Sequence, residues 1–409
     1  MIKDLHLNTS ASTIFCVLLM VFSSFIFFQS DSPFLPHFLS GLLSLIVLLI
    51  AVLLLMTSSK NDNSVISFLY IFSALTYWFL EYIHSYNHLS ISSILVVFVL
   101  FCICRSSSFT KREAFKWYYY IVAITAFLGI VSYILYELRI GPFLISEYYT
   151  DESFASYASY YVSNILVLSL NNYDFSRLCG LYNEPGLLGT VCALLLSADS
   201  FKHKKASIVL LIAGILTFSA AFWLLLVLFF TMRTLIYGSI RTKIVSACFL
   251  LVFFYLVNQS YDNIILDNFF NRFRLEDGKI NGDDRMNSSL QMYWNATLKD
   301  THKLLWGYGS YIKVEGSSSI VSLIVKHGII GTIAFMLPLL IASFKQINKS
   351  REALIYVLMF MISIYQRPQV FNAMYFVMLI GGIEYIKNQP VCKINYLNFD
   401  KNVFEKNVE

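Results

Sequence analysis

The sequence predicts an all-α polytopic membrane protein. Hydrophobic residues make up 57% of the chain and charged residues only 13%, whereas about a quarter of the residues of a soluble domain are charged. Apolar runs close to twenty residues long recur from end to end, and each is long enough to cross a hydrocarbon core of about 30 Å. A transmembrane barrel would instead alternate apolar and polar residues in segments of about ten, a pattern that this sequence does not show.

The apolar runs predict about 12 transmembrane helices. The expected spans are residues 12–29, 37–56, 65–81, 89–104, 117–136, 185–199, 206–219, 221–237, 243–258, 319–344, 353–366 and 370–387. The stretch 206–237 is too long for a single span, so we expect a tight turn at Thr217, Ser219 and the Ala220-Ala221 pair. The first run has no small-residue cleavage site and is expected to remain as an anchor.

Lysine and arginine gather in alternate short loops, which the positive-inside rule assigns to the cytoplasm. With the N-terminus inside, the basic groups at 105–116, 202–205, 233–243 and 345–351 are cytoplasmic, as are both termini. The net charge of +5 follows from this bias and indicates no nucleic-acid partner. The seven cysteines show neither a disulfide framework nor metal-ligand spacing. We therefore expect no metal and no cofactor.

Two long loops remain on the outer side, and long loops inside a compact protein are usually functional. The resulting organisation is an N-terminal five-helix part at 1–136, an outer loop with an interfacial helix at 137–184, central transmembrane helices at 185–258, a large outer loop at 259–318, three C-terminal helices at 319–387 and a cytoplasmic tail at 388–409.

Each outer loop is expected to contain an amphipathic helix lying on the bilayer. In the first loop the apolar residues recur at three- and four-residue steps: Phe154, Tyr157, Tyr161, Ile165 and Leu168. In the second they recur at four-residue steps directly after Asp283-Asp284-Arg285: Met286, Leu290, Trp294 and Leu298. The aromatic residues of both loops fit a glycan ligand as well as they fit a membrane aromatic belt.

The segment from Arg177 to Gly189 joins the first outer loop to the sixth span. Pro185 suits the first position of a helix, which makes Glu184 the N-cap residue. Arg177 lies seven residues upstream and is not needed to start a helix. One interpretation is that Glu184 caps the helix while Arg177 anchors the chain at the interface. The other is a site at the membrane surface that combines a basic and an acidic residue.

Charge is nearly absent from the middles of the spans, which weighs against an ion or substrate path through them. Arginines gather instead near the outer interface: Arg177, Arg272, Arg274, Arg285 and Arg367. Arginine binds phosphate oxygens in a bidentate manner and stays protonated, so this set suits a lipid-linked phosphate or pyrophosphate. The alternative for any single arginine is ordinary interfacial anchoring. The acidic pairs Glu276-Asp277 and Asp283-Asp284 are expected to be solvated rather than metal-bound.

The pattern Arg177-x-x-Gly180-x-Tyr182-x-Glu184-Pro185-Gly186 before a span resembles the O-antigen polymerases (Wzy type). Further similar elements follow in order: Arg285, Trp306-Gly307-Tyr308-Gly309, Gly328-Ile-Ile-Gly331-Thr332 at the start of a span, and Arg367-Pro368 before the last span. The resemblance covers most of the chain in topology. Each motif is loose by itself, so the resemblance rests on their order and spacing.

The resemblance implies an inner-membrane glycosyltransferase of the GT-C type. It would transfer a growing glycan from undecaprenyl pyrophosphate to a lipid-linked repeat unit at the periplasmic face, with the bilayer and a chain-length regulator protein as candidate partners. Arg285 and Arg177 would stabilise the departing pyrophosphate. Tyr182 and three further arginines would contribute to substrate binding, namely Arg272, Arg274 and Arg367. Glu184 would be the base for the acceptor hydroxyl or would orient Arg177, and His327 is a second candidate base.

Two other functions are weighed against the polymerase. The related O-antigen ligases share the Gly-x-x-Gly-Thr segment but carry a histidine eleven residues before its first glycine, where this chain has Ser317. That difference favours the polymerase. A lipid-linked oligosaccharide flippase or other transporter would need polar residues lining a path through the spans, and a non-catalytic scaffold would leave the outer arginines unexplained.

Overall fold

The computed structural model describes the protein in segments. They are residues 11–25, 68, 72, 75–76, 79, 103, 105–140, 143–149, 157–162, 166–170, 176–182, 184–257, 259, 270, 273–276, 279–280, 288–309, 320–347, 350–366 and 373–388. Most of these residues are helical. The spans expected at 37–56, 65–81 and 89–104 lie almost wholly outside the described residues.

Eleven helices have their bounds within the described residues, and nine of them overlap predicted spans. They are α1 (Ala11–Ser24), α5 (Ser108–Glu137), α6 (Pro185–Asp199), α7 (Lys204–Leu216), α8 (Ala220–Tyr237), α9 (Ile240–Val257), α11 (Ser288–Lys299), α12 (Thr301–Trp306), α13 (Ile320–Ile347), α14 (Arg351–Gln366) and α15 (Ala373–Lys387). Of these, α5 and α8 are long and apolar enough to cross a membrane. At about 1.5 Å per residue, α6 and α7 extend only about 20 Å each.

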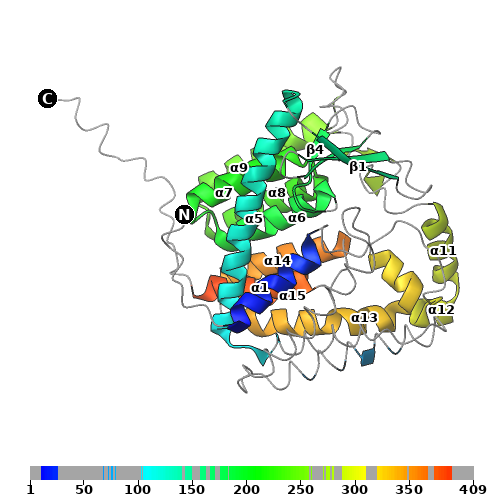
Figure 1. Cartoon of the computed structure of the whole chain (residues 1–409). Helices are drawn as coiled ribbons and strands as arrows, with labels where there is room; N and C mark the ends of the chain where they lie inside the picture. The colour runs from blue at the N-terminus through cyan, green and yellow to red at the C-terminus, as the bar shows by residue number, and fades with distance from the viewer. Residues whose placement is uncertain are drawn as a thin grey trace.

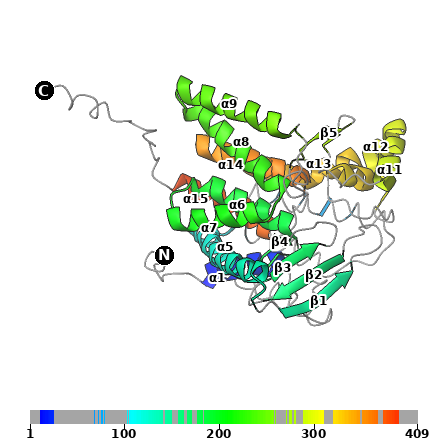
Figure 2. The same cartoon turned by 90° about the horizontal axis from the view of Figure 1, so that it is seen from above.

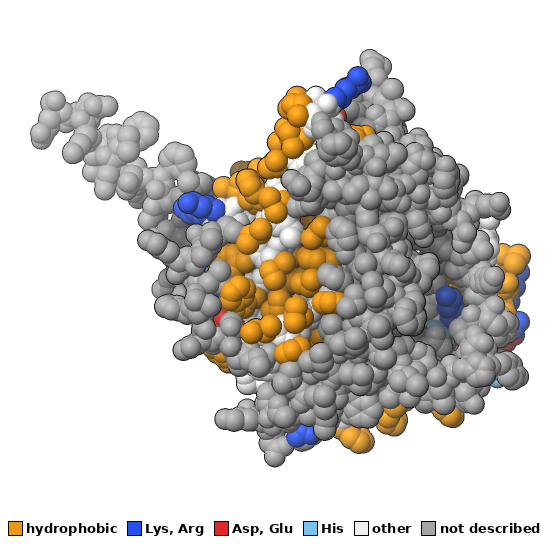
Figure 3. Space-filling view, viewed as in Figure 1, with side chains coloured by type: hydrophobic (Ala, Val, Ile, Leu, Met, Phe, Trp, Pro, Cys, Tyr) orange, Lys and Arg blue, Asp and Glu red, His pale blue; other side chains and the backbone are white. Residues whose placement is uncertain are grey.

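The helix α5 has one face in the core and one apolar face outside it. Tyr118, Val122 and Ala126 are buried, and α1, α7 and α15 pack against this helix. On the other face Phe127 and Ile134 are exposed. In Figure 3 hydrophobic side chains gather in one area among the residues that the structure describes. Soluble monomers rarely expose contiguous apolar patches of this kind, so the surface fits a lipid environment.

The helices α6 and α7 form a tight hairpin that continues into α8. The turn expected within 206–237 is confirmed, because α7 ends at Leu216 and α8 begins at Ala220. Ser219 is the N-cap of α8, and its side chain accepts a hydrogen bond from the Phe222 backbone N–H at 3.5 Å. A Cβ atom on Gly189 of α6 would lie 2.9 Å from Ser219 Cβ. The turn therefore lies directly on the first half of α6.

The segment expected to be the first outer loop contains a sheet instead of the predicted interfacial helix. Four antiparallel strands pair in sequence order, as Figure 2 shows: β1 (Phe143–Tyr149), β2 (Tyr157–Val162), β3 (Leu166–Leu170) and β4 (Ser176–Leu178). The prediction of a helix spanning Phe154–Leu168 is therefore wrong, and the all-α class does not hold for this segment. The physical reason is composition, because tyrosine and valine favour a pleated sheet over a helix.

In the segment expected to be the second outer loop, the predicted helix is confirmed as α11, and a short helix, α12, follows it. On α11, Leu290 is buried against Val325 of α13, with Trp294 half-buried beside them. Leu298, expected on the same face, is exposed. The paired strands β5 (Leu275–Glu276) and β6 (Lys279–Ile280) precede α11. In Figure 1 α11 and α12 lie beside the bent end of α13.

Candidate functional site

Arg177 lies on β4, where it braces the turn between α7 and α8. Its Nε donates to the Thr217 carbonyl at 2.9 Å and its Nη2 to the Phe218 carbonyl at 3.4 Å. The residue is 7% exposed. The last carbonyls of a helix lack intrahelical partners and carry the negative end of the helix dipole. The guanidinium therefore stabilises the C-terminal end of α7, which neither interpretation from the sequence had anticipated.

The strand β4 is also tied to the end of α5. The Ser176 hydroxyl donates to the Glu137 carboxylate. The Tyr133 hydroxyl donates to the Ser176 carbonyl at 3.2 Å. Arg177 is thus held between α5 and the α7–α8 turn.

Tyr182 lies in the core beneath the same segment. Its hydroxyl is 3.0 Å from that of Tyr118 on α5, and its ring packs edge-on against Phe25 at 5.5 Å between centroids. Its backbone N–H donates to the Cys179 carbonyl at 3.1 Å, across a turn in which Gly180 has a φ of +57°. At 1% exposure, Tyr182 is placed to fix the path of the chain into α6.

Glu184 occupies the N-cap position of α6, as the sequence predicted. Its backbone is extended, with φ −150° and ψ 148°, and Pro185 takes the first helical position. Its main-chain carbonyl accepts from the Leu187 backbone N–H at 3.2 Å. Its side chain, however, makes no capping hydrogen bond. The start of α6 is therefore set by the main chain of Glu184 and not by a side-chain hydrogen bond.

A second group of motif residues forms a backbone contact that we call the glycine clasp, made by residues 305–309 and 325–328. The Tyr308 N–H donates to the Val325 carbonyl at 2.9 Å and the Gly309 N–H to the Lys326 carbonyl at 2.8 Å. Gly307 has a φ of +80° and a ψ of −178°. Gly328 interrupts α13 with φ 67° and ψ −179°, and Figure 1 shows the resulting bend.

The clasp can form only because both glycines lack a Cβ atom. A Cβ on Gly307 would lie 2.3 Å from the Lys326 carbonyl oxygen, and one on Gly328 would lie 2.1 Å from that of Leu305. The backbone region near φ +70° with ψ near 180° is also essentially restricted to glycine. Two motifs that are separate in the sequence are therefore one structural unit.

His327 lies inside the glycine clasp and is 3% exposed. It occupies the last position before the break in α13. On the outer side of the clasp, the Lys303 ammonium lies 4.3 Å from the centre of the Tyr308 ring. The Tyr293 ring packs against that of Tyr308 at 5.5 Å. The clasp thus joins a buried imidazole to a small aromatic and cationic cluster.

The structure places Arg177 against the α7–α8 turn, Tyr182 in the core beside α5, Glu184 at the N-cap of α6 and His327 in the clasp. Arg274 donates from its Nη2 to the Gln259 carbonyl. The other three predicted arginines, Arg272, Arg285 and Arg367, lie outside the described residues. Within the described part of the chain, no three His, Cys, Asp or Glu side chains are grouped to hold a metal ion.

Comparison of the chain with protein-family models and with curated proteins gives no match.

Replacing Arg177 with alanine is expected to destabilise the protein by about 1.5–3 kcal/mol, because carbonyls at the end of α7 lose a charged donor. Lysine should recover only part of this loss, since its ammonium lacks the planar fork of arginine. Thermal unfolding of the detergent-solubilised protein measures the effect. Arg241→Ala, at an exposed position on α9, is the matched control and should be neutral. Full recovery of stability in Arg177→Lys would contradict the role of the guanidinium in holding the turn between α7 and α8.

Proposed function

We propose that this protein is an O-antigen polymerase of the Wzy type. It transfers a growing glycan from undecaprenyl pyrophosphate to a hydroxyl of a lipid-linked repeat unit at the periplasmic face of the inner membrane. The proposal includes about 12 spans and cytoplasmic termini. A chain-length regulator protein is a candidate partner.

The observation that supports this proposal most is the position of Glu184 at the start of α6 without a side-chain capping hydrogen bond. A capping role was the simplest explanation of this residue, but its side chain makes no capping hydrogen bond. The residue is held between a buried tyrosine and a buried helix, Tyr182 and α6. A carboxylate at the start of a buried helix suits a general base, because catalysis needs the base within hydrogen-bond reach of the proton it removes.

In the proposed reaction Glu184 accepts the proton of the acceptor hydroxyl as that oxygen attacks the anomeric carbon of the donor. The bond from this carbon to the pyrophosphate oxygen breaks, and negative charge develops on the leaving group. Arginines at the outer interface stabilise that charge, with Arg285 first and Arg272, Arg274 and Arg367 behind it. We assign Arg177 and Tyr182 to positioning Glu184, because both are buried, Arg177 bonds to the α7–α8 turn and Tyr182 bonds to α5.

Deletion of the gene in a strain that makes lipopolysaccharide tests the proposal. We expect lipopolysaccharide that carries a single repeat unit, because a separate ligase still attaches single units. Ser317→Ala should leave normal ladders, since serine does not serve as a base at neutral pH without activation. Lipopolysaccharide with no repeat units, together with accumulated lipid-linked polymer, would show that the protein is the ligase. Unchanged ladders in the deletion strain would exclude both.

A further inference from the structure

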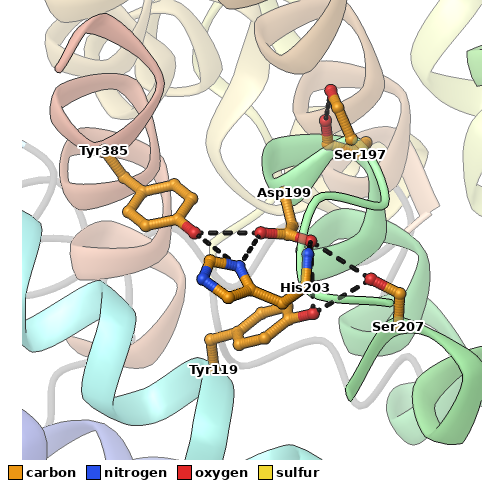
Figure 4. A network of polar contacts seen from close by, with 7 residues as sticks. Tyr119, Ser197, Asp199, His203, Ser207 and Tyr385 are labelled. Atoms are coloured by element: carbon orange, nitrogen blue, oxygen red, sulfur yellow. Dashed lines mark hydrogen bonds and ion pairs between the residues drawn. The ribbon is translucent and has the colours of Figure 1, made fainter. Parts of the chain in front are cut away.

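A buried polar network lies at the opposite end of α6 from Glu184. Its centre is Asp199, the last residue of α6, whose side chain is fully buried. Figure 4 shows three donors around it that come from three different helices. They are the hydroxyls of Tyr385 on α15 at 2.9 Å, Ser207 on α7 at 3.1 Å and Tyr119 on α5 at 3.4 Å. One carboxylate therefore joins four helices.

The turn that follows Asp199 is held by the same carboxylate. His203 donates to it from its backbone N–H at 2.9 Å, and its Nδ1 lies 2.5 Å from the Asp199 Oδ1 atom. Between them, Ser200 and Phe201 have φ values of +53° and +61°. Left-handed conformations in residues other than glycine cost about 1–2 kcal/mol each. The turn is thus a strained one that the surrounding contacts must maintain.

This network is saturated and has no capacity for a ligand. A carboxylate offers about four lone-pair positions. The Oδ1 atom of Asp199 already faces His203 Nδ1 and Tyr385, and its Oδ2 atom faces the His203 N–H, Ser207 and Tyr119. A metal ion or substrate would have to displace these protein donors. The arrangement is that of a structural hydrogen-bond network that holds the end of α6 in place.

Two consecutive residues of α5 form hydrogen bonds near the two ends of α6. Tyr118 bonds to Tyr182, just before the helix, and Tyr119 bonds to Asp199 at its end. Between these contacts α6 is buried from Leu187 to Asp199. A buried helix fixed at its last residue cannot slide or rotate without displacing its first one, which lies about 21 Å away at about 1.5 Å per residue.

We propose that Asp199 is a positioning residue that sets the axial position of α6 and thereby the place of Glu184. The consequence for catalysis rests on the proposed polymerase function. The anchoring of α6 is independent of that function. Tyr385 is the most informative of the donors, because it is the contribution of α15, an element remote in sequence from α6.

Tyr385→Phe tests the proposal, since it removes one donor without leaving several donors unpaired, as Asp199→Ala would. Tyr356→Phe is the matched control. Tyr356 is also a buried tyrosine of the C-terminal helices, but its hydroxyl donates to the Met378 carbonyl at 2.6 Å and not to Asp199. Both variants lose one buried hydroxyl, so a purely structural role predicts equal effects.

Two measurements are made on each full-length variant, namely hydrogen exchange of the peptide covering residues 184–192 and the polymer ladder of the complemented deletion strain. We expect Tyr385→Phe to raise exchange at the start of α6 and to reduce long polymer, each by about tenfold. Tyr356→Phe should change neither. Equal effects of the two variants, or unchanged exchange in Tyr385→Phe, would overturn the anchoring of α6.

Two further outcomes separate the inference from the function it rests on. Raised exchange in Tyr385→Phe with a normal ladder would overturn the link from Asp199 to catalysis and leave the polymerase assignment intact. A wild-type protein that restores no polymer would refute the polymerase assignment. In that case raised exchange in Tyr385→Phe alone would still support Asp199 as the anchor of α6.

Discussion

Glu184→Gln is expected to abolish the long polymer while the protein folds normally. Glutamine keeps the size of the side chain but cannot accept a proton at neutral pH. Loss of a general base typically lowers a rate by about 10²–10⁴-fold, which is enough to remove the ladder. Because the Glu184 side chain makes no capping bond, the stability should change by less than the ~0.5–2 kcal/mol that loss of a cap costs.

Ser107→Ala provides the comparison for a genuine cap. Ser107 is the N-cap of α5, and its hydroxyl accepts from the Thr110 backbone N–H at 3.1 Å. This variant should lose about 0.5–2 kcal/mol and keep its ladder. Ladder patterns and thermal unfolding of both variants give the result. A normal ladder from Glu184→Gln, or a stability loss equal to that of Ser107→Ala, would remove Glu184 from the mechanism.

The helices could be predicted because their signals are local. Pro185 marks the first residue of α6 through its missing N–H and fixed φ, and the structure begins the helix there. Thr217 and Ser219 stand where an apolar run becomes too long for one helix, and the turn forms at that point. Such features depend on a few neighbouring residues, so one sequence is enough to locate them.

The sheet and the partner of Arg177 could not be predicted in the same way. Apolar residues at three- and four-residue steps in the first outer loop matched a helix, but strand pairing decided the outcome. For example, Leu168 on β3 pairs with Arg177 on β4. Arg177 was expected to face a phosphate, yet it bonds to carbonyls forty residues further along the chain. Contacts between distant segments leave no local pattern in a single sequence.

The contact between Asp199 and His203 has a local signal in the sequence. Asp199 is an acidic residue at the end of an apolar run, followed four residues later by His203. Charged residues inside membrane segments are rare and usually paired, so this pair predicts a local contact. Tyr119 and Tyr385, which complete the network, lie 80 and 186 residues away from Asp199. Only the fold reveals that they converge.

Gly328→Ala is expected to destabilise the protein strongly, with a loss of about 3–5 kcal/mol. Alanine would be forced into φ 67° and ψ −179°, a region that costs about 1–3 kcal/mol for other residues. Its Cβ would also lie 2.1 Å from the Leu305 carbonyl oxygen. Backbone atoms cannot move aside as a flexible side chain can, so the glycine clasp must open. Polymer should disappear with it, because His327 loses its surroundings.

Gly180→Ala separates the cost of the backbone conformation from the cost of the close Cβ contact. Gly180 also has a positive φ, +57°, but a Cβ there would meet only Leu188 Cδ2, at 3.6 Å. This variant should therefore lose only the conformational part, about 1–2 kcal/mol. Gly307→Ala should resemble Gly328→Ala, since its Cβ would lie 2.3 Å from the Lys326 carbonyl oxygen. Unfolding midpoints of the three detergent-solubilised variants rank the losses. Equal losses at Gly180 and Gly328 would show that backbone conformation alone, and not the close contact of the clasp, requires glycine at Gly328.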